Sequence, residues 1–169
     1  KKDSDAGSFE NIAAQYNEEK LKIVINCLPN TVKRALELAN VCQNIILLDG
    51  DYSERDIQIG YAVTIKGEGN ATLTDVTSFV SDANFTLKNL KISNLNTENF
   101  IKQNKDNLVI SNCIFTNNNA VLVYNNGFAS LTNSILLNNS KVVDGNIDDC
   151  VLDYNWWGNT LNNISKPLN

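Results

Sequence analysis

Histidine and methionine are both absent from this chain of 169 residues, and arginine occurs only twice, at Arg34 and Arg55. Without histidine the chain lacks the usual general base, the usual metal ligand and any Ser-His or Cys-His catalytic arrangement. The net charge of −5 argues against a nucleic-acid partner, because such proteins carry a basic surface. We therefore expect no catalytic residues, no metal site and no cofactor.

Long apolar runs are missing as well. No stretch reaches the 18 apolar residues or more of a membrane-spanning helix, so we expect that the chain does not itself cross a membrane. Apolar residues still make up 43% of the sequence, which is enough for a folded core. Because the sequence has no methionine and begins KKDSD, we expect it to be part of a larger, multi-domain protein.

Asparagine is the most abundant residue type, with 29 copies that concentrate beyond residue 84. This residue tolerates left-handed backbone conformations, and its side chain bonds its own backbone in turns. A folded chain with so much asparagine needs many similar tight turns. The composition therefore indicates a structural repeat.

Four segments can be laid over one another: FTLKNLKISN (85–94), LVISNCIFTN (108–117), ASLTNSILLN (129–138) and IDDCVLDYN (147–155). Apolar and polar residues alternate on both sides of a central asparagine, whose position Asp149 takes in the fourth segment. Alternation predicts strands with one buried face, and the central asparagine predicts a corner. Weaker copies at 44–52 and 62–70 come first. The roughly 20-residue period, without helices between the later copies, predicts an all-β, right-handed parallel β-helix of about six coils.

The alignment also predicts which side chains point into the rod. Four inward rows follow from it: Phe85, Leu108 and Ala129; Leu87, Ile110, Leu131 and Ile147; Leu90, Cys113, Ser134 and Cys150; and Ile92, Phe115, Leu136 and Leu152. The corner residues Asn89, Asn112 and Asn133 are predicted to form an internal ladder of amides that bond from coil to coil.

Both ends of such a rod need covering, because they expose core and unpaired strand edges. The segment from Thr31 to Val41 has the pattern of an amphipathic helix with Asn30 as its N-cap, and it would close the first coil. Residues 1–27 are predicted to be an extension with a short helix at SFENIAAQYN and a strand at 21–26. The rod proper spans 28–160, and 161–169 form a tail. The predicted cap of the last coil consists of Tyr154, Trp156, Trp157 and Gly158.

The four cysteines divide into two pairs. Cys27 and Cys42 flank the predicted helix and are a candidate disulfide. Cys113 and Cys150 fall in one predicted row with Ser134 between them. Two coil steps of about 4.8 Å exceed the reach of a disulfide, so these two are expected to be buried thiols.

One predicted feature does not follow from the fold, namely an apolar patch on the outside of the rod. It consists of Ile114, Ile135, Leu137 and Val151. Patches of this kind indicate either a partner or a covering segment. Two interpretations stay open: the tail folds back and covers the patch with Leu161, Ile164 and Leu168, or the patch is a binding surface.

The motif YNWWGNT, preceded by coils that carry FTNN (115–118) and LLNN (136–139), resembles the adhesin-like surface proteins of methanogenic archaea. The segment TVKRALELANVCQNIILLDGDY is similar to the opening of pectin-lyase-like β-helices, and FTNN also matches the short FxxN repeat of chlamydial polymorphic outer-membrane proteins. The resemblance implies an extracellular, non-catalytic, cell-surface domain that attaches to other cells, surfaces or glycans. Its partner would be an unidentified cell-surface protein or glycan.

Two other functions remain as alternatives to attachment. The same fold carries polysaccharide lyases and hydrolases, which need a base beside acidic groups or paired carboxylates from neighbouring coils. Asp148, Asp149 and Asp153 cluster near the last coil, where they serve either turn chemistry or a weak cation or sugar site. The third function is a passive stalk that holds another domain away from the cell.

Overall fold

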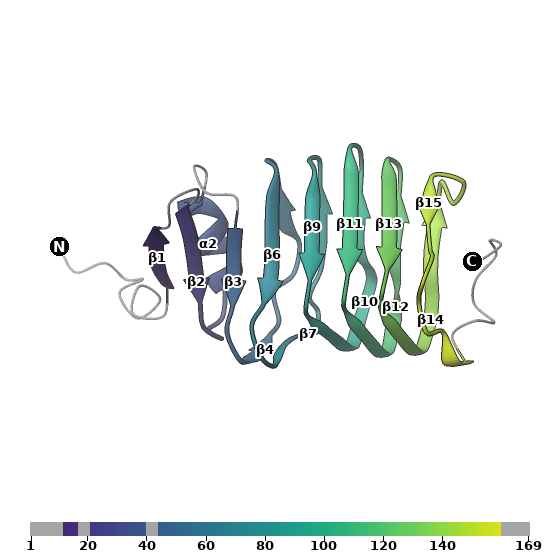
Figure 1. The fold of residues 1–169 in the computed structure, drawn as a ribbon, viewed down its shortest axis with the longest axis horizontal. Coiled ribbons are helices and arrows are strands. Elements are labelled where there is room, and N and C mark those ends of the chain that lie inside the picture. The colour runs from purple at the N-terminus through teal and green to yellow at the C-terminus, as the bar shows by residue number, and fades with distance from the viewer. Residues whose placement is uncertain (1–11, 17–20, 40–43, 160–169) are drawn as a thin grey trace.

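The computed structural model describes residues 12–16, 21–39 and 44–159, and it has the form of a rod of stacked coils (Figure 1). Nearly all of its strands pair in parallel with the equivalent strand of the next coil. The result is a parallel β-solenoid of about six turns with one short helix near its N-terminal end. The predicted fold class is therefore confirmed.

One face of the rod is a sheet of eight strands. In spatial order these are β1 (Ile12–Tyr16), β2 (Leu21–Ile25), β3 (Asn44–Leu47), β6 (Val63–Gly67), β9 (Phe85–Lys88), β11 (Asn107–Ser111), β13 (Phe128–Thr132) and β15 (Cys150–Val151). Only the first pair, β1 with β2, is antiparallel.

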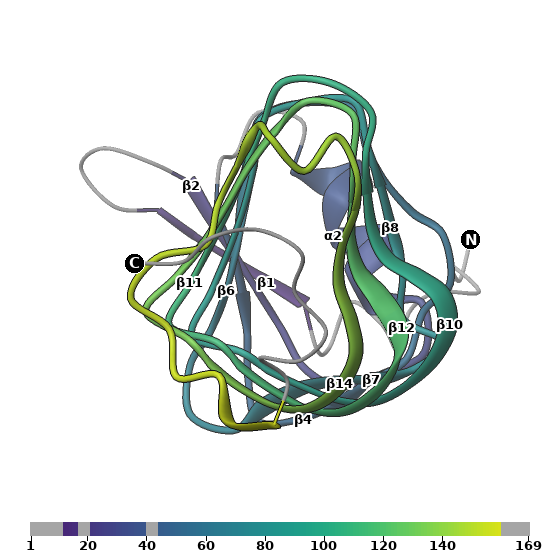
Figure 2. The ribbon, with the colours of Figure 1, turned by 90° about the vertical axis from the view of Figure 1, so that its right-hand side faces the viewer.

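A second sheet forms the rest of the wall. It contains β4 (Gly50–Tyr52), β5 (Ile57–Ile59), β7 (Ala71–Asp75), β8 (Phe79–Ser81), β10 (Lys91–Gln103), β12 (Ile114–Asn125) and β14 (Ile135–Gly145). The first part of β10 pairs with β7 and its last part with β8, and the register shifts in between. These shifts bend the long strands, so a coil has three sides when viewed along the rod (Figure 2).

All four predicted inward rows are confirmed over their first three members, which are buried. Leu87 lies opposite Ile110, which lies opposite Leu131, and all three are at most 2% exposed. Phenylalanines add cross-coil contacts, since the Phe79 ring is 5.7 Å from Phe100 in an edge-to-face arrangement. A dry core of stacked aliphatic and aromatic side chains therefore holds the coils together.

The alignment of the last coil was wrong by five residues. The pairing of Ala129 with Cys150 and of Ser130 with Val151 lays CVLDYNWWGN, rather than IDDCVLDYN, over the preceding repeat. Cys150 therefore joins the Phe85 row, and Ile147 lies outside the Leu87 row. The cause is Tyr154, which takes the left-handed corner (φ 59°) that asparagine holds in the earlier coils.

The helix α2 (Thr31–Leu38) covers the N-terminal end of the rod, with Val32, Ala35 and Leu36 buried beneath it. It begins where predicted and ends before Val41, which lies outside the described residues. Asn30 makes no side-chain cap hydrogen bond, because its backbone is left-handed (φ 61°).

A side chain from a later coil replaces the predicted N-cap. The backbone N–H groups of Val32 and Lys33 donate to the two carboxylate oxygens of Glu54, at 2.9 and 3.0 Å. Glu54 is only 2% exposed. The first turn of the helix is thus tied directly to the rod.

The predicted helix at 8–17 is wrong over the residues that the structure describes there. Residues Ile12–Tyr16 form β1, antiparallel to β2, and the predicted strand at 21–26 is confirmed as β2. The open edge of β2 offers unpaired backbone groups to the segment, and pairing with them outweighs its local helical tendency. No helix in the described part of the chain has the length and apolar character needed to cross a membrane.

Candidate binding sites on the rod

The four residues of the predicted outer apolar patch lie on two different sheets. Ile114 and Ile135 face each other on neighbouring coils, 37% and 43% exposed, and Leu137 continues the surface. Trp156, which the prediction placed in the cap, bridges to Ile135 and extends this row. Val151 pairs with Ser130 on the other sheet and is not part of it. We call Ile114, Ile135, Leu137 and Trp156 the outer apolar row.

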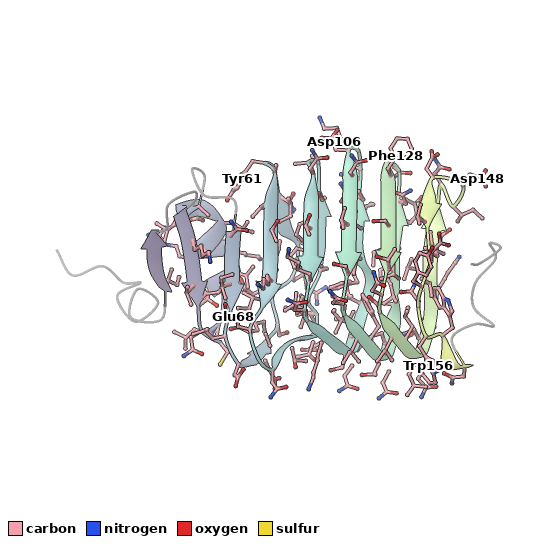
Figure 3. All side chains as sticks on the ribbon, viewed as in Figure 1. Tyr61, Glu68, Asp106, Phe128, Asp148 and Trp156 are labelled. Carbon is pink, nitrogen blue, oxygen red and sulfur yellow. The ribbon has the colours of Figure 1, made fainter. Side chains whose placement is uncertain are left out.

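The indole of Trp156 is 57% exposed at the C-terminal end of the rod (Figure 3). It lies close to Gly158. A Cβ atom at Gly158 would be 2.8 Å from Trp156 Cζ3 and 3.2 Å from Leu137 Cδ1. Gly158 also has a left-handed backbone (φ 46°). The absence of a side chain at Gly158 thus leaves room for the Trp156 ring.

The four residues predicted as a C-terminal cap have separate places. Trp157 is half-buried and packs against the core, which is the position of a cap. Tyr154 is 76% exposed at its corner, and Trp156 faces solvent as well. The tail that was expected to cover the outer row, from 161 onward, lies outside the described residues.

A ladder of asparagine amides runs beside the outer apolar row. Asn138 Nδ2 donates to Asn117 Oδ1 at 3.1 Å, and Asn159 Nδ2 donates to Asn138 Oδ1 at 2.6 Å. We call these three residues the outer ladder. They border a hollow of about 360 Å³ whose remaining walls are further amides and one hydroxyl: Asn118, Asn119, Asn139 and Ser140.

The internal ladder exists, but on other asparagines than predicted. Asn89, Asn112 and Asn133 are exposed, with left-handed backbones (φ 52 to 57°). The buried amides are Asn118 and Asn139, 3% and 2% exposed, whose side chains bond each other at 2.8 Å. A residue at a left-handed corner points its side chain outward, so the inward amide comes from a residue on the following strand.

The cysteines are placed as follows. Cys113 and Cys150 are both 1% exposed, so their prediction as buried thiols is confirmed, although they occupy different rows. Burial raises the pKa of the Cys113 thiol to about 12. Cys27 is exposed, while Cys42 lies outside the described residues, so the pairing of these two stays a prediction.

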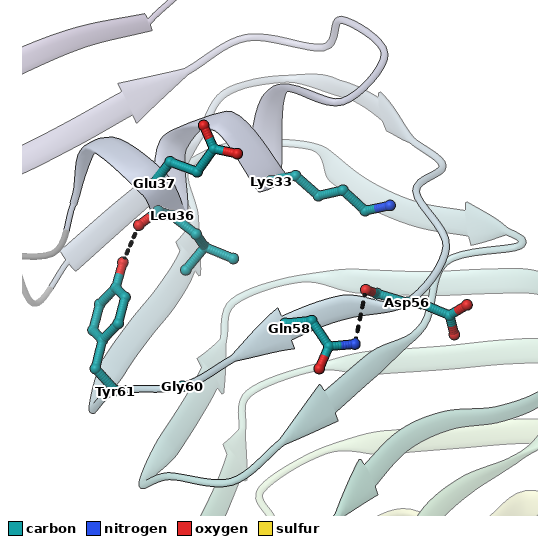
Figure 4. Close-up of a pocket in the computed structure, with 7 residues that line it drawn as sticks. All are labelled: Lys33, Leu36, Glu37, Asp56, Gln58, Gly60 and Tyr61. Carbon is teal, nitrogen blue, oxygen red and sulfur yellow. Dashed lines mark hydrogen bonds between the residues drawn. The ribbon is translucent and has the colours of Figure 1, made fainter.

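The hollow between α2 and β5, of about 470 Å³, contains charges of both signs (Figure 4). One hydrogen bond in this hollow joins the helix to the rod, and the other polar contacts lie within the helix or within the β5 segment. The Tyr61 hydroxyl donates to the Leu36 carbonyl, and the Gln58 amide donates to the Asp56 carbonyl at 3.3 Å. Glu37 pairs with Arg34 at 2.8 Å, a partner that the sequence did not predict. This hollow is therefore best explained as the joint between helix and rod.

One acidic residue at the last coil has a structural use. Asp149 accepts a hydrogen bond from the Asn146 side chain within the turn before β15, as turn chemistry requires. Within residues 12–16, 21–39 and 44–159, no three acidic or cysteine side chains come together as a metal site. Arg55 borders a separate hollow of about 260 Å³ together with Glu98 and Lys102.

Two polar groups near the N-terminal end of the rod have shifted pKa values. Burial raises the pKa of Glu54 despite the two backbone N–H groups that it binds. Burial also raises the pKa of Tyr52, whose hydroxyl donates to the Leu48 carbonyl at 2.8 Å. Both residues lie within the closed end of the rod and serve its structure.

The chain is thus a parallel β-solenoid whose last coils present an apolar row and an amide-lined hollow side by side. No family model, no curated protein and no solved structure matches it.

Proposed function

We propose that this chain is a non-catalytic, extracellular attachment domain that binds a glycan of a cell or other surface. The binding site is the corner where the outer apolar row meets the amide-lined hollow. The observation that carries the proposal is the exposed Trp156 ring beside the outer ladder of Asn117, Asn138 and Asn159.

The chemistry of these groups matches that of a sugar. A pyranose ring has an apolar C–H face and a rim of hydroxyls that both donate and accept hydrogen bonds. An exposed indole offers a flat apolar surface of large area, and an amide offers both a donor and an acceptor. A neutral site of this kind distinguishes sugars by hydroxyl geometry rather than by charge.

The site is also preorganised. The amides of the outer ladder bond one another across coils, and Asn159 Oδ1 accepts from the backbone N–H of Asn138 at 2.8 Å. The backbone beneath is fixed by parallel pairing of β12 with β14. Little side-chain entropy is lost when such a site binds, which favours affinity from a small contact area.

The test is a screen of the wild-type chain on a glycan array and on whole cells, followed by titration of the bound glycan in solution. Trp156→Ala and Ile135→Lys should each weaken binding about tenfold or more while the melting temperature stays within a few degrees. Leu38→Lys, which changes an apolar residue of similar exposure to Ile135 (37% against 43%) at the other end of the rod, is the matched control and should bind normally.

Other outcomes would identify the alternative functions. Shortened or unsaturated products after incubation with acidic polysaccharides and calcium would indicate a carbohydrate-active enzyme. Failure of the wild-type chain to bind any glycan or cell would favour a passive stalk. A large loss of stability in Ile135→Lys would indicate that the row is covered by another part of the protein.

A further inference from the structure

A second hollow, of about 410 Å³, lies on the eight-stranded sheet around the starts of β11, β13 and β15. Its volume falls within the range of about 300 to 1,000 Å³ of small-ligand sites. In Figure 3 its residues Phe128 and Asp148 lie along one edge of the rod, with Trp156 at the opposite edge. The hollow is therefore separate from the proposed glycan site.

The walls of this hollow combine an exposed aromatic ring with acidic groups. Phe128 is 59% exposed, the most exposed phenylalanine of the described residues. Val109 and Val151, 39% and 49% exposed, line the same hollow on either side of Ser130, two residues further along β13. Asp148 and Asp149 supply two carboxylates, and none of the residues that line the hollow is basic. Exposed apolar side chains gathered in one hollow indicate a ligand.

The turns that carry these groups are held by hydrogen bonds. The backbone N–H of Phe128 donates to the Asp106 carbonyl at 2.9 Å, and that of Gly127 donates to Asn125 Oδ1 at 3.1 Å. On the other side, Ala129 donates its N–H to the Asp149 carbonyl at 3.1 Å. The aromatic ring and the carboxylates thus extend from one fixed framework.

We infer that this hollow binds an amino sugar with a free, protonated amine. Carboxylates attract the ammonium group, and an aromatic face attracts both a cation and the C–H face of a sugar ring. The side chains of Asn107 and Ser130, which also line the hollow, can bond sugar hydroxyls. The charge of the hollow and its mixture of apolar and polar groups together favour this occupant over a neutral sugar.

The test compares two oligosaccharides of equal length that differ only in charge: an oligomer of glucosamine and the corresponding oligomer of N-acetylglucosamine. Each is titrated calorimetrically into the wild-type chain at mildly acidic pH and low salt. The glucosamine oligomer should bind and the acetylated oligomer should not. Binding should weaken as salt is added, because the attraction is between exposed charges.

Variants then place the binding in this hollow. Phe128→Ala should weaken it about tenfold, and Asp148→Asn about threefold to fivefold, as expected for an exposed charge pair. Asp153→Asn removes a carboxylate on the same coil outside the hollow and should change nothing. Trp156→Ala, which tests the proposed glycan site, should also leave this binding intact, so the two hypotheses fail separately.

Three results would overturn the inference. Equal binding of the two oligomers would show that the charge is not recognised. If a folded Asp148→Asn variant bound the glucosamine oligomer as the wild type does, or lost no more affinity than Asp153→Asn, the carboxylates of this hollow would not take part in binding. Equally tight binding of choline or of a lysine-containing peptide would show that the hollow recognises an ammonium group without a sugar.

Discussion

At the N-terminal end of the rod, polar groups are buried and satisfied, whereas in the last two coils apolar groups are exposed. Glu54 binds the first turn of α2 and Tyr52 binds the Leu48 carbonyl, and each side chain is only 2% exposed. At the other end the apolar side chains of Ile135 and Trp156 face solvent. All coils of the solenoid share one backbone arrangement. Whether a region closes the fold or presents a binding surface therefore depends on the side chains that its coils carry.

The largest expected effect is a difference in stability between an inward-facing and an outward-facing substitution on the same late coil. Phe115→Ala should lower the free energy of unfolding by about 3 to 5 kcal/mol, because it leaves a cavity beside Phe100, 6.2 Å away ring to ring. Ile114→Ala, one residue earlier on the outer face, should cost less than about 1 kcal/mol. Urea unfolding followed by circular dichroism measures both. Similar losses in the two variants would mean that the outer row is packed against something.

The next effect concerns the inner asparagines. Asn118 Nδ2 donates to the Ile92 carbonyl and to Asn139, and its Oδ1 accepts from the Leu95 N–H at 3.0 Å. Asn118→Ala should therefore cost about 2 kcal/mol, since buried backbone groups lose their partners. Asn119→Ala, at an exposed position next to it, should cost less than about 0.5 kcal/mol. If Asn118→Ala also cost less than about 0.5 kcal/mol, water would have to replace all the hydrogen bonds of the Asn118 amide.

A pH titration tests the closed end of the rod alone. Because the pKa of Glu54 is raised in the folded chain, its folded form binds protons more tightly than its unfolded form. Its contribution to stability is therefore complete below the ordinary glutamate pKa of about 4.5 and is lost as the pH rises through the folded value. Glu54→Gln has no such group, so the wild type should lose stability relative to this variant as the pH rises above about 4.5.

The measurement is the free energy of unfolding of both proteins at several pH values, taken from urea denaturation. Parallel pH profiles of the wild type and Glu54→Gln would contradict the raised pKa, and a wild type that gains stability with pH would reverse its sign.

The sequence predicted the rod and much of its core, because alternation and period are properties of neighbouring residues. Leu87, Ile110 and Leu131 form one row for this reason. Contacts between distant segments carry no such signal, so the capping of α2 by Glu54, 22 residues away, was not predicted. The outer ladder was missed as well, although the asparagine pairs 117–118 and 138–139, one coil apart, were the available sign.

The last coil shows how a single residue misled the prediction, and it supplies the smallest effect. Tyr154 holds a left-handed corner that is asparagine in three earlier coils, among them Asn133 (φ 52°). Asparagine tolerates this conformation better than tyrosine does, and 76% of the Tyr154 surface is exposed, so little packing would be lost. Tyr154→Asn should therefore raise the free energy of unfolding by about 0.5 kcal/mol, and Asn133→Tyr should lower it by a similar or larger amount. Opposite signs in urea denaturation would establish that the corner, and not the aromatic ring, sets the stability there. A loss of stability in Tyr154→Asn would instead show that the ring covers the end of the rod, and the C-terminal coils would then be closed in the same way as the N-terminal ones.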